Sequence, residues 1–325
     1  MSINVRKVLG VMALLVSMVV QAQTPSKNVT IFVPQPAGNP TDGVARKIQP
    51  LLQKAIGQTV VVENLPGAGG SIGTQKMLTN TADGTSILIA SQTEPILTPY
   101  TLKHVKYKPE DMLVVGLVSR LPYVLVGRPD FPANNVTEFL NQARQAGKVP
   151  LNFGHIGPGS MIHLLGEQMA RKGNYAINGV PYKGVPPVVQ DLIGGQIDYS
   201  FLPLGGSTLS LIEAGKVKAY ATTGHSASVA LPKLPRLVTS DKAMTDFVYG
   251  TWIAFLVSAK TPPAVVERLI SALQESMKEQ EFQYYVTSTG MELANLRTSS
   301  ELNAFYAGET RLYQGLARAV GVEPL

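Results

Sequence analysis

The chain has 325 residues, of which 45% are hydrophobic and 15% are charged, and it contains no cysteine and four histidines. A chain of this length usually forms about two domains, and its apolar content excludes an intrinsically disordered protein. The lack of cysteine excludes disulfides, thiolate zinc sites, a cysteine nucleophile and a lipoprotein anchor. The formal net charge of +6 comes from scattered Lys and Arg residues, so nucleic acid is not an expected partner.

The N-terminus has the pattern of a secretory signal peptide. Arg6 and Lys7 precede an uncharged run over residues 8–20, and Val20 and Ala22 occupy the −3 and −1 positions of a cleavage site. The run is shorter than the roughly 20 residues that cross a bilayer as a helix. We therefore expect residues 1–22 to be removed near Ala22 and the protein to be periplasmic. Removing 22 of the 325 residues leaves 303 and lowers the formal charge from +6 to +4.

Strand and helix patterns alternate after the signal peptide. Apolar, β-prone runs predict strands over residues 29–33, 59–63 and 86–90. Thr41 or Asp42 is expected to cap an amphipathic helix that follows the loop over residues 34–40. A second Gly-rich loop over residues 65–73 precedes a further helix. This alternation predicts an α/β fold with a largely parallel sheet.

The same pattern restarts in the middle of the chain. The residues there predict strands over residues 123–126, 151–153, 197–201 and 217–222, and helices over residues 136–146, 161–171, 187–193 and 209–214. A Pro- and Ser-rich stretch over residues 226–237 is interpreted as a return linker. The remaining chain predicts a strand over residues 247–258 and helices over residues 262–278 and 299–319.

The motifs of several enzyme classes are absent. The Gly-rich run from Gly67 has Ile72 where a dinucleotide-binding fingerprint needs its third Gly, and no P-loop, G-x-S-x-G or H-E-x-x-H motif occurs. His155 lies in a Gly-rich loop, where it could contact a ligand, stabilise the loop or act as a base. We therefore predict no catalytic residue, no metal ligand and no cofactor.

Two strand–loop–helix junctions are the informative pattern. The loop over residues 35–41 and the loop over residues 155–160 each follow a strand and lead into a helix. A helix N-terminus carries unpaired N–H groups and a partial positive charge, which favour a small anion. One such loop in each half of the chain predicts a cleft that holds a carboxylate from two sides.

The chain resembles the periplasmic solute-binding proteins of the tripartite tricarboxylate transporter type, the Bug family. The resemblance covers essentially the whole mature chain. It is carried by Val33-Pro34, residues 42–46, Gly57-Gln58, residues 60–73 (VVVENLPGAGGSIG), Asp83-Gly84, Gly157, Gly159-Ser160, His163-Leu164, residues 180–184, residues 191–198, residues 214–219 and Pro262-Pro263.

The resemblance implies a two-domain Venus-flytrap fold of the periplasmic-binding-protein type, with mixed, mostly parallel sheets and flanking helices. Domain 1 would comprise residues 23–125 plus 230–325, and domain 2 residues 126–229. It also implies a monomeric, non-enzymatic protein that binds a small carboxylate for a membrane permease. Presentation of the ligand to a membrane sensor kinase is the first alternative, and an exported hydrolase is the second.

The expected ligand contacts combine the resemblance with the two loops. They are Gln35, Ala37, Gly38, Asn39, Ser91, Thr93, His155, Gly157, Gly159, Ser160 and Leu202. Backbone N–H groups around Ala37, Gly38, Gly157 and Gly159 would hold the carboxylate. The family often has a polar residue near position 202, so Leu202 predicts a ligand with an apolar or aromatic body and no ammonium group.

Overall fold

The computed structural model describes residues 27–145, 149–224, 226–228, 230–295 and 298–321. The predicted signal peptide therefore lies outside the described residues. The described strands are β1 (Val29–Val33), β2 (Val60–Asn64), β3 (Ser86–Ala90), β4 (Met112–Gly127), β5 (Leu151–His155), β6 (Ile177–Pro181), β7 (Tyr199–Pro203), β8 (Lys218–Thr222), β9 (Gly250–Ser258) and β10 (Glu292–Leu293).

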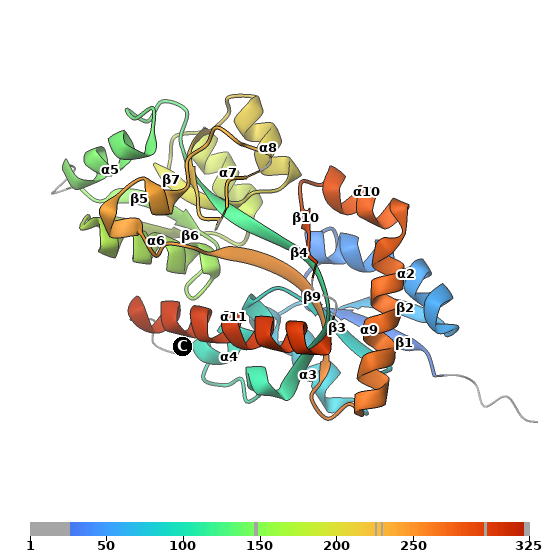
Figure 1. Ribbon diagram of the computed structural model, residues 1–325. Coiled ribbons are helices and arrows are strands. Elements are labelled where there is room, and N and C mark those ends of the chain that lie inside the picture. Colours follow the sequence, from blue (N-terminus) through green and yellow to red (C-terminus); the bar gives the residue numbers. More distant parts are fainter. Residues whose placement is uncertain (1–26, 146–148, 225, 229, 296–297, 322–325) are drawn as a thin grey trace, which may run out of the picture.

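The described helices surround the sheet (Figure 1). They are α2 (Pro40–Ile56), α3 (Ser71–Thr79), α4 (Thr98–Thr101), α5 (Val136–Gln145), α6 (Met161–Gly173), α7 (Val185–Ile193), α8 (Gly206–Glu213), α9 (Pro263–Lys278), α10 (Gln280–Ser288) and α11 (Ser299–Ala319). Short helical turns are η1 (Ala68–Gly70), η2 (Thr93–Leu97), η3 (Pro109–Asp111), η4 (Leu237–Thr239) and η5 (Lys242–Met244). No helix among these residues is long and apolar enough to cross a membrane.

The sheet is mixed, with the order β2-β1-β3-β9-β4-β7-β5-β6, while β8 and β10 also pair with β4. Pairing is parallel among β2, β1 and β3, which we call the β1 flank, and among β7, β5 and β6, which we call the β5 flank. Parallel pairing was expected there. Every pair that involves β4 or β9 is antiparallel, so the centre differs from the flanks.

Strand β4 connects the two flanks. It pairs with β9 as far as Pro122, and from Tyr123 onward it pairs with β7 and β8. The sequence predicted only residues 123–126 of this strand, because Arg120 and Pro122 interrupt the apolar run. The change of partner lies close to the predicted domain boundary at residue 125, and that boundary stays a prediction.

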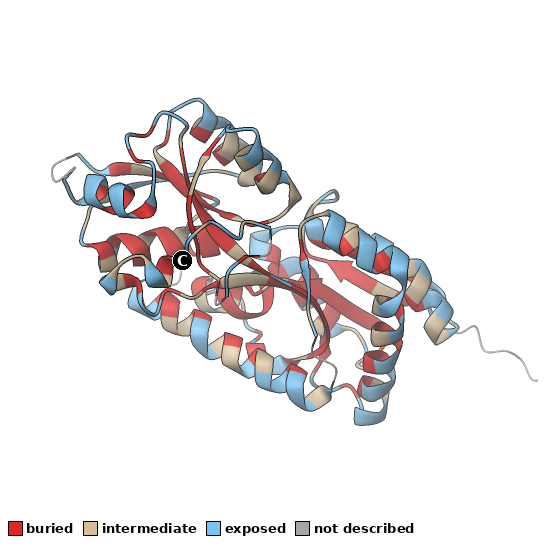
Figure 2. Ribbon diagram, turned by 45° about the horizontal axis from the view of Figure 1, so that its top comes forward, coloured by how far each residue is buried: buried red, intermediate tan, exposed pale blue. Residues whose placement is uncertain are grey.

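The hydrophobic core continues along the sheet from one flank to the other. Its main cluster contains β1, β3 and β9 residues together with Phe153 and Tyr199 of the β5 flank and Phe139 of α5. Figure 2 shows the buried residues along the strands and on the inward faces of the helices. A smaller cluster around Val188 and Leu202 lies beneath α7. The strands therefore form a continuous apolar support for the loops at their ends.

Candidate ligand-binding site

The loops predicted to bind an anion follow the carboxyl ends of parallel strands. One loop (residues 34–39) follows β1, a second segment (residues 91–101) follows β3, and a third loop (residues 156–160) follows β5. We call these three segments the strand-end loops. Ligands of open α/β sheets bind outside the carboxyl ends of the strands. The topology therefore places the predicted residues where this class of fold binds its ligands.

The first strand-end loop is ordered by its own polar side chains. Asn39 caps α2, since its Oδ1 accepts from the Thr41 N–H at 3.0 Å, and Pro40 occupies the first helical position. The prediction that Thr41 or Asp42 caps this helix was wrong, because the helix begins at Pro40 and both residues lie in its first turn. The hydroxyl of Thr41 donates to Oε1 of Gln35 and, at 2.8 Å, to Oδ1 of Asn39. Thr41 thus brings Gln35 and Asn39 together, while their contact with a ligand stays a prediction.

Glu94 joins the first two strand-end loops. Its Oε1 accepts from Nε2 of Gln35 at 2.5 Å, and its Oε2 accepts from the N–H and hydroxyl of Ser91 at 3.0 and 2.9 Å. Ser91 Oγ accepts in turn from the Thr93 N–H at 3.2 Å. Glu94 is 2% exposed, and burial raises the pKa of its carboxyl group despite the hydrogen bonds from Gln35 and Ser91. The sequence reasoning named Ser91 and Thr93 but missed Glu94.

The raised pKa of Glu94 predicts a pH-dependent cost of its charge. The folded state holds the proton of Glu94 more tightly than the unfolded state does. The stability that this proton gives the folded state is therefore fully present below the ordinary pKa of 4.5 and is lost as the pH rises through the raised pKa. The difference in unfolding free energy between Glu94→Gln and the wild type should therefore shift in favour of the variant as the pH rises from 5 to 8. Urea unfolding at both pH values measures this. Glu267→Gln, on the exposed side of α9, is the control, and equal pH slopes for wild type and Glu94→Gln would contradict the prediction.

One predicted backbone donor of the first loop is already used within the protein. The Gly38 N–H donates to Oδ2 of Asp42 at 2.9 Å. Burial opposes ionisation of Asp42, but hydrogen bonds from Gly38, Arg46 and Asn64 together lower the pKa of its carboxyl group. The direct contact of Gly38 with a ligand stays a prediction. It would require the Gly38 N–H to leave Asp42 and bond the ligand in its place. The neighbouring Ala37 is exposed.

The third strand-end loop is held by two histidines. Nδ1 of His155 accepts from the Gly157 N–H, and Nδ1 of His163 accepts from the Gly159 N–H, both at 3.2 Å. Ser160 caps α6, since its hydroxyl accepts from the His163 N–H at 3.3 Å and donates to the Gly157 carbonyl at 2.7 Å. The sequence predicted this loop but missed the role of His163, whose signal was its position in the first turn of α6.

The third strand-end loop meets the segment that follows β3. A Cβ atom at Gly159 would lie 2.9 Å from Cγ2 of Thr101, the last residue of α4. A second contact between the flanks is the hydrogen bond from the Gly206 N–H, at the start of α8, to the Thr289 carbonyl at 2.6 Å. These close approaches hold the strand-end loops near one another.

Leu202 does not lie with the other predicted residues. It is 0% exposed and belongs to the small apolar cluster with Val124 and Val188. Its role as a ligand contact stays a prediction that this burial does not favour. The prediction that the ligand lacks an ammonium group rested on Leu202 and loses that support.

Gln92 connects the second strand-end loop to the centre of the sheet. This buried side chain accepts at Oε1 from the Thr251 hydroxyl at 3.1 Å and from the Trp252 N–H at 3.4 Å, and its amide donates to the Gly250 carbonyl at 3.4 Å. Gly250 pairs with Pro122, where β4 changes partner. Gln92 therefore links the segment that carries Ser91 and Glu94 to the place where β4 changes partner.

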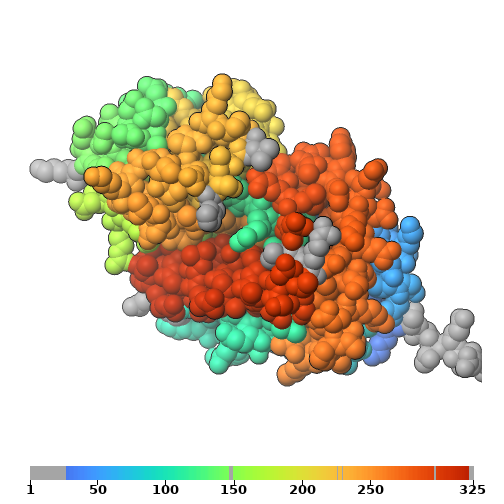
Figure 3. Space-filling view, viewed as in Figure 1, coloured from blue at the N-terminus to red at the C-terminus, as the bar shows by residue number. Residues whose placement is uncertain are grey.

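A cavity of about 320 Å³ lies beside α11 and β4, where Figure 3 shows a hollow in the surface. Arg120, Trp252, Glu292, Glu309 and Tyr313 are among its lining residues. None of the predicted ligand contacts lines it. The cavity is thus a feature of the central strands and is separate from the strand-end loops.

No cluster of His, Asp and Glu that could hold a metal ion occurs among the described residues. The site offers backbone N–H groups, hydroxyls, amides and imidazoles, while its buried acid, Glu94, has no Lys or Arg partner among the described ion pairs. These groups suit hydrogen bonding to a small polar ligand.

Comparison with known proteins places the chain in a family. The family model described as the tripartite tricarboxylate transporter family receptor matches residues 44–321, and the chain belongs to this family. Members are periplasmic substrate-binding proteins that bind small carboxylates and work with transporter components. The resemblance stated from the sequence and the expected fold class are thereby confirmed.

Individual relatives cover most of the chain. BugT of Bordetella pertussis is 30% identical over 92% of this chain and 91% of its own. A protein encoded between ttuE and ttuC' in Agrobacterium vitis is 35% identical over 80% of this chain and 75% of its own.

Solved structures that are similar to this chain share its fold. The periplasmic binding protein BugD is 32% identical, with a TM-score of 0.77 over 93% of this chain and 100% of its own. MatC of Rhodopseudomonas palustris with bound malate is 25% identical, with a TM-score of 0.76 over 90% of this chain and 99% of its own. An adipate-bound protein of R. palustris is 24% identical, with a TM-score of 0.79 over 93% and 100%, and is similar in fold.

Proposed function

We propose that this protein captures a small organic carboxylate between the strand-end loops and delivers it to a membrane permease. The observation that carries the proposal is the pair of Gly-containing loops after β1 and β5, each leading into a capped helix. Both loops lie against the segment that follows β3, the first through the Gln35–Glu94 hydrogen bond and the other through the close approach of Gly159 to Thr101. The malate bound to MatC and the adipate bound to a second relative support this class of ligand.

The proposal keeps the predicted organisation of the chain. Residues 1–22 direct export to the periplasm, residues 23–125 plus 230–325 form one domain, and residues 126–229 form the other. The monomer binds its ligand without catalysis or cofactor. The ligand contacts come from Gln35, Ala37, Gly38, Asn39, Ser91, Thr93, His155, Gly157, Gly159 and Ser160, and an apolar ligand body would require Leu202 to become accessible.

The helix termini supply only part of the binding free energy. Each dipole contributes about 0.3–1 kcal/mol, whereas micromolar binding corresponds to about 8 kcal/mol. Hydrogen bonds from Asn39 and Ser160, together with exclusion of water when the loops approach, must supply the larger share. Two weak dipoles therefore orient the carboxylate, and directed hydrogen bonds fix its position.

Calorimetric titration of the mature protein with a panel that includes malate, adipate and aromatic monocarboxylates tests the proposal. We expect saturable binding of at least one carboxylate with one site per chain, weakened by Asn39→Ala and Ser160→Ala. His104→Gln, an exposed substitution on the segment after α4, is the matched control. A folded protein that binds no member of the panel would contradict the proposal.

Delivery to a sensor kinase remains the alternative to delivery to a permease. The two roles use the same ligand site, so only the partner separates them. Affinity purification of the ligand-loaded protein from the producing organism's membranes should recover permease subunits. Recovery of a histidine kinase in their place would assign the sensing role.

A further inference from the structure

The two glycine N–H groups that should hold a carboxylate are occupied by histidines. Gly157 donates to Nδ1 of His155 and Gly159 donates to Nδ1 of His163, each at 3.2 Å. An imidazole nitrogen accepts a hydrogen bond only when it carries no proton. Nδ1 is therefore unprotonated in both rings. The Gly157 and Gly159 N–H groups each have an acceptor within the protein.

The two rings form one unit. Their centroids lie 4.6 Å apart, and His155 also stacks on Phe153 at 5.9 Å. His155 is 3% exposed. Burial, followed by the nearby His163, lowers the pKa of the His155 imidazole, and burial lowers the pKa of His163. Both rings are thus neutral acceptors at neutral pH.

We propose that His155 and His163 are positioning residues that couple carboxylate binding to proton uptake. In the neutral form each ring occupies one glycine N–H of the loop. A proton taken from solvent onto Nδ1 breaks that bond, frees the N–H for the ligand carboxylate and places a positive charge beside it. The inference deepens the proposed function and rests on it, because the carboxylate is the group that stabilises the protonated ring.

The surroundings favour this exchange. Glu167 of α6 is the acidic group that faces the pair, with its Oε1 3.7 Å from Nε2 of His163, and its charge also favours protonation of His155. The β6 strand presents the backbone of Gly179 to His155, where a Cβ would lie 3.2 Å from Nε2. Thr101 of α4 faces the loop on its other side and carries no charge. Among these groups, Glu167 is the one acidic side chain.

The first experiment needs no ligand. In protein labelled with ¹⁵N at glycine and histidine, Nδ1 of both rings should be the unprotonated nitrogen at pH 8. The Gly157 and Gly159 amide signals should shift together with ring protonation as the pH falls. His155→Gln should abolish the titration of Gly157 and leave that of Gly159. Glycine amide signals that do not follow ring protonation would overturn the inference, whatever the protein binds.

The second experiment measures protons during binding, with malate and adipate as the probes. Calorimetry at pH 6 in two buffers of different ionisation enthalpy should show uptake of up to about two protons, one for each ring, and affinity should rise below pH 8 by up to about tenfold per pH unit for each proton taken up. The variant His155→Gln/His163→Gln should bind with no proton uptake, whereas His104→Gln should behave as the wild type.

The outcomes separate the two proposals. Binding with a buffer-independent enthalpy and a constant affinity between pH 8 and pH 6 overturns the coupling and leaves the binding function standing. Failure of both probes to bind at any pH counts against the proposed function, while the glycine titration still decides whether the histidines control the loop. If the double variant does not fold, the proton count of the wild type at pH 6 decides alone.

Discussion

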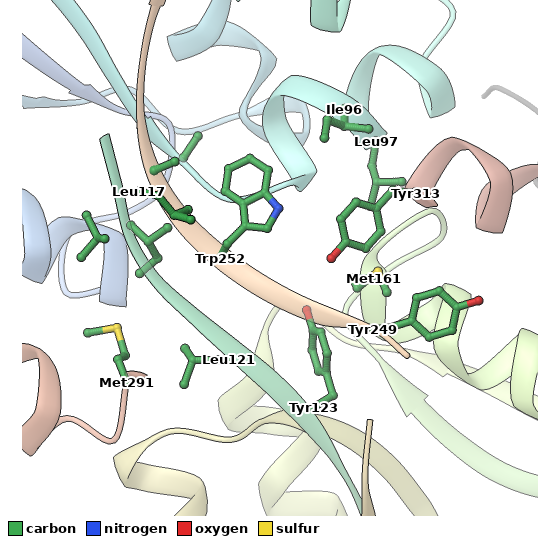
Figure 4. Packing of buried hydrophobic residues seen from close by; sticks show 14 of the residues in the cluster. Ile96, Leu97, Leu117, Leu121, Tyr123, Met161, Tyr249, Trp252, Met291 and Tyr313 are labelled. Carbon is green, nitrogen blue, oxygen red and sulfur yellow. The ribbon is translucent and has the colours of Figure 1, made fainter. Parts of the chain in front are cut away.

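Trp252→Ala is expected to lower the free energy of unfolding by about 3–5 kcal/mol, the usual range for a buried tryptophan replaced by alanine. Trp252 is the single tryptophan of the chain and is 1% exposed. Figure 4 shows its indole in the cluster that also contains Leu117, Leu97 and Tyr313. Its ring also packs edge-on against Phe305, with centroids 5.7 Å apart. Urea unfolding followed by circular dichroism measures the loss.

A polar contact adds to the loss of packing. Nε1 of Trp252 donates to Oε2 of Glu309 at 3.1 Å, and Arg120 donates to Oε1 at 3.1 Å. Burial raises the pKa of the Glu309 carboxyl group, so the loss of a donor is costly there. Trp252→Phe keeps most of the ring and removes only the N–H, so it should lose less than Trp252→Ala. An alanine variant within about 1 kcal/mol of the wild type would contradict this account of the core.

Gly159→Ala is expected to weaken carboxylate binding by roughly tenfold or more, which corresponds to at least about 1.4 kcal/mol. Gly159 has φ +76°, a conformation that costs an alanine about 1–2 kcal/mol. The added Cβ would also lie 2.9 Å from Cγ2 and 3.1 Å from Cβ of Thr101. The substitution therefore strains the loop and pushes it away from the segment that follows β3. Titration with malate and adipate measures the effect.

Two matched variants separate strain from the contact with Thr101. Gly157 has φ +110°, and a Cβ there would meet nothing within 4 Å, so Gly157→Ala imposes backbone strain without a clash. We expect it to weaken binding less than Gly159→Ala. Thr101→Ala should partly restore binding in the Gly159→Ala background, and a double-mutant cycle gives the coupling. Additive effects of the two substitutions would show that the close approach of Thr101 does not limit binding.

The elements with strong local signals could be predicted from the sequence. The strand at residues 29–33 and the helix at residues 299–319 occur where they were expected, because an apolar β-prone run and an amphipathic period are local properties. Helix α10 was missed. It begins at Gln280, directly after the extended residue Glu279 that ends α9, and no turn residue marks this break.

The candidate site was predictable only in part. Gln35, Asn39 and Ser160 could be named because Gly-rich loops before helices leave a local signature, although the cap of α2 was assigned to Thr41 or Asp42 and is Asn39. Glu94 could not be named, because its role depends on a hydrogen bond from Gln35, 59 residues away, that only the folded chain brings within reach. His163 was missed although its partner Gly159 is only four residues away and its position in the first turn of α6 is a local signal. Leu202 was named as a ligand contact but is buried in the core. An apolar residue at a strand end can face the core as readily as a ligand, and the sequence does not distinguish the two.

The sequence by itself determined the alternation of strands and helices, the absence of thiol chemistry and the position of two loops before capped helices. These are properties of neighbouring residues, and they need no knowledge of the far contacts. The tertiary structure decided the antiparallel centre of the sheet, the burial of Glu94 and the hydrogen bond that Glu94 accepts from Gln35, 59 residues away. Those features arise because strands that are distant in the sequence pair side by side and bring their side chains into one water-poor region, where an unpaired donor or charge is costly.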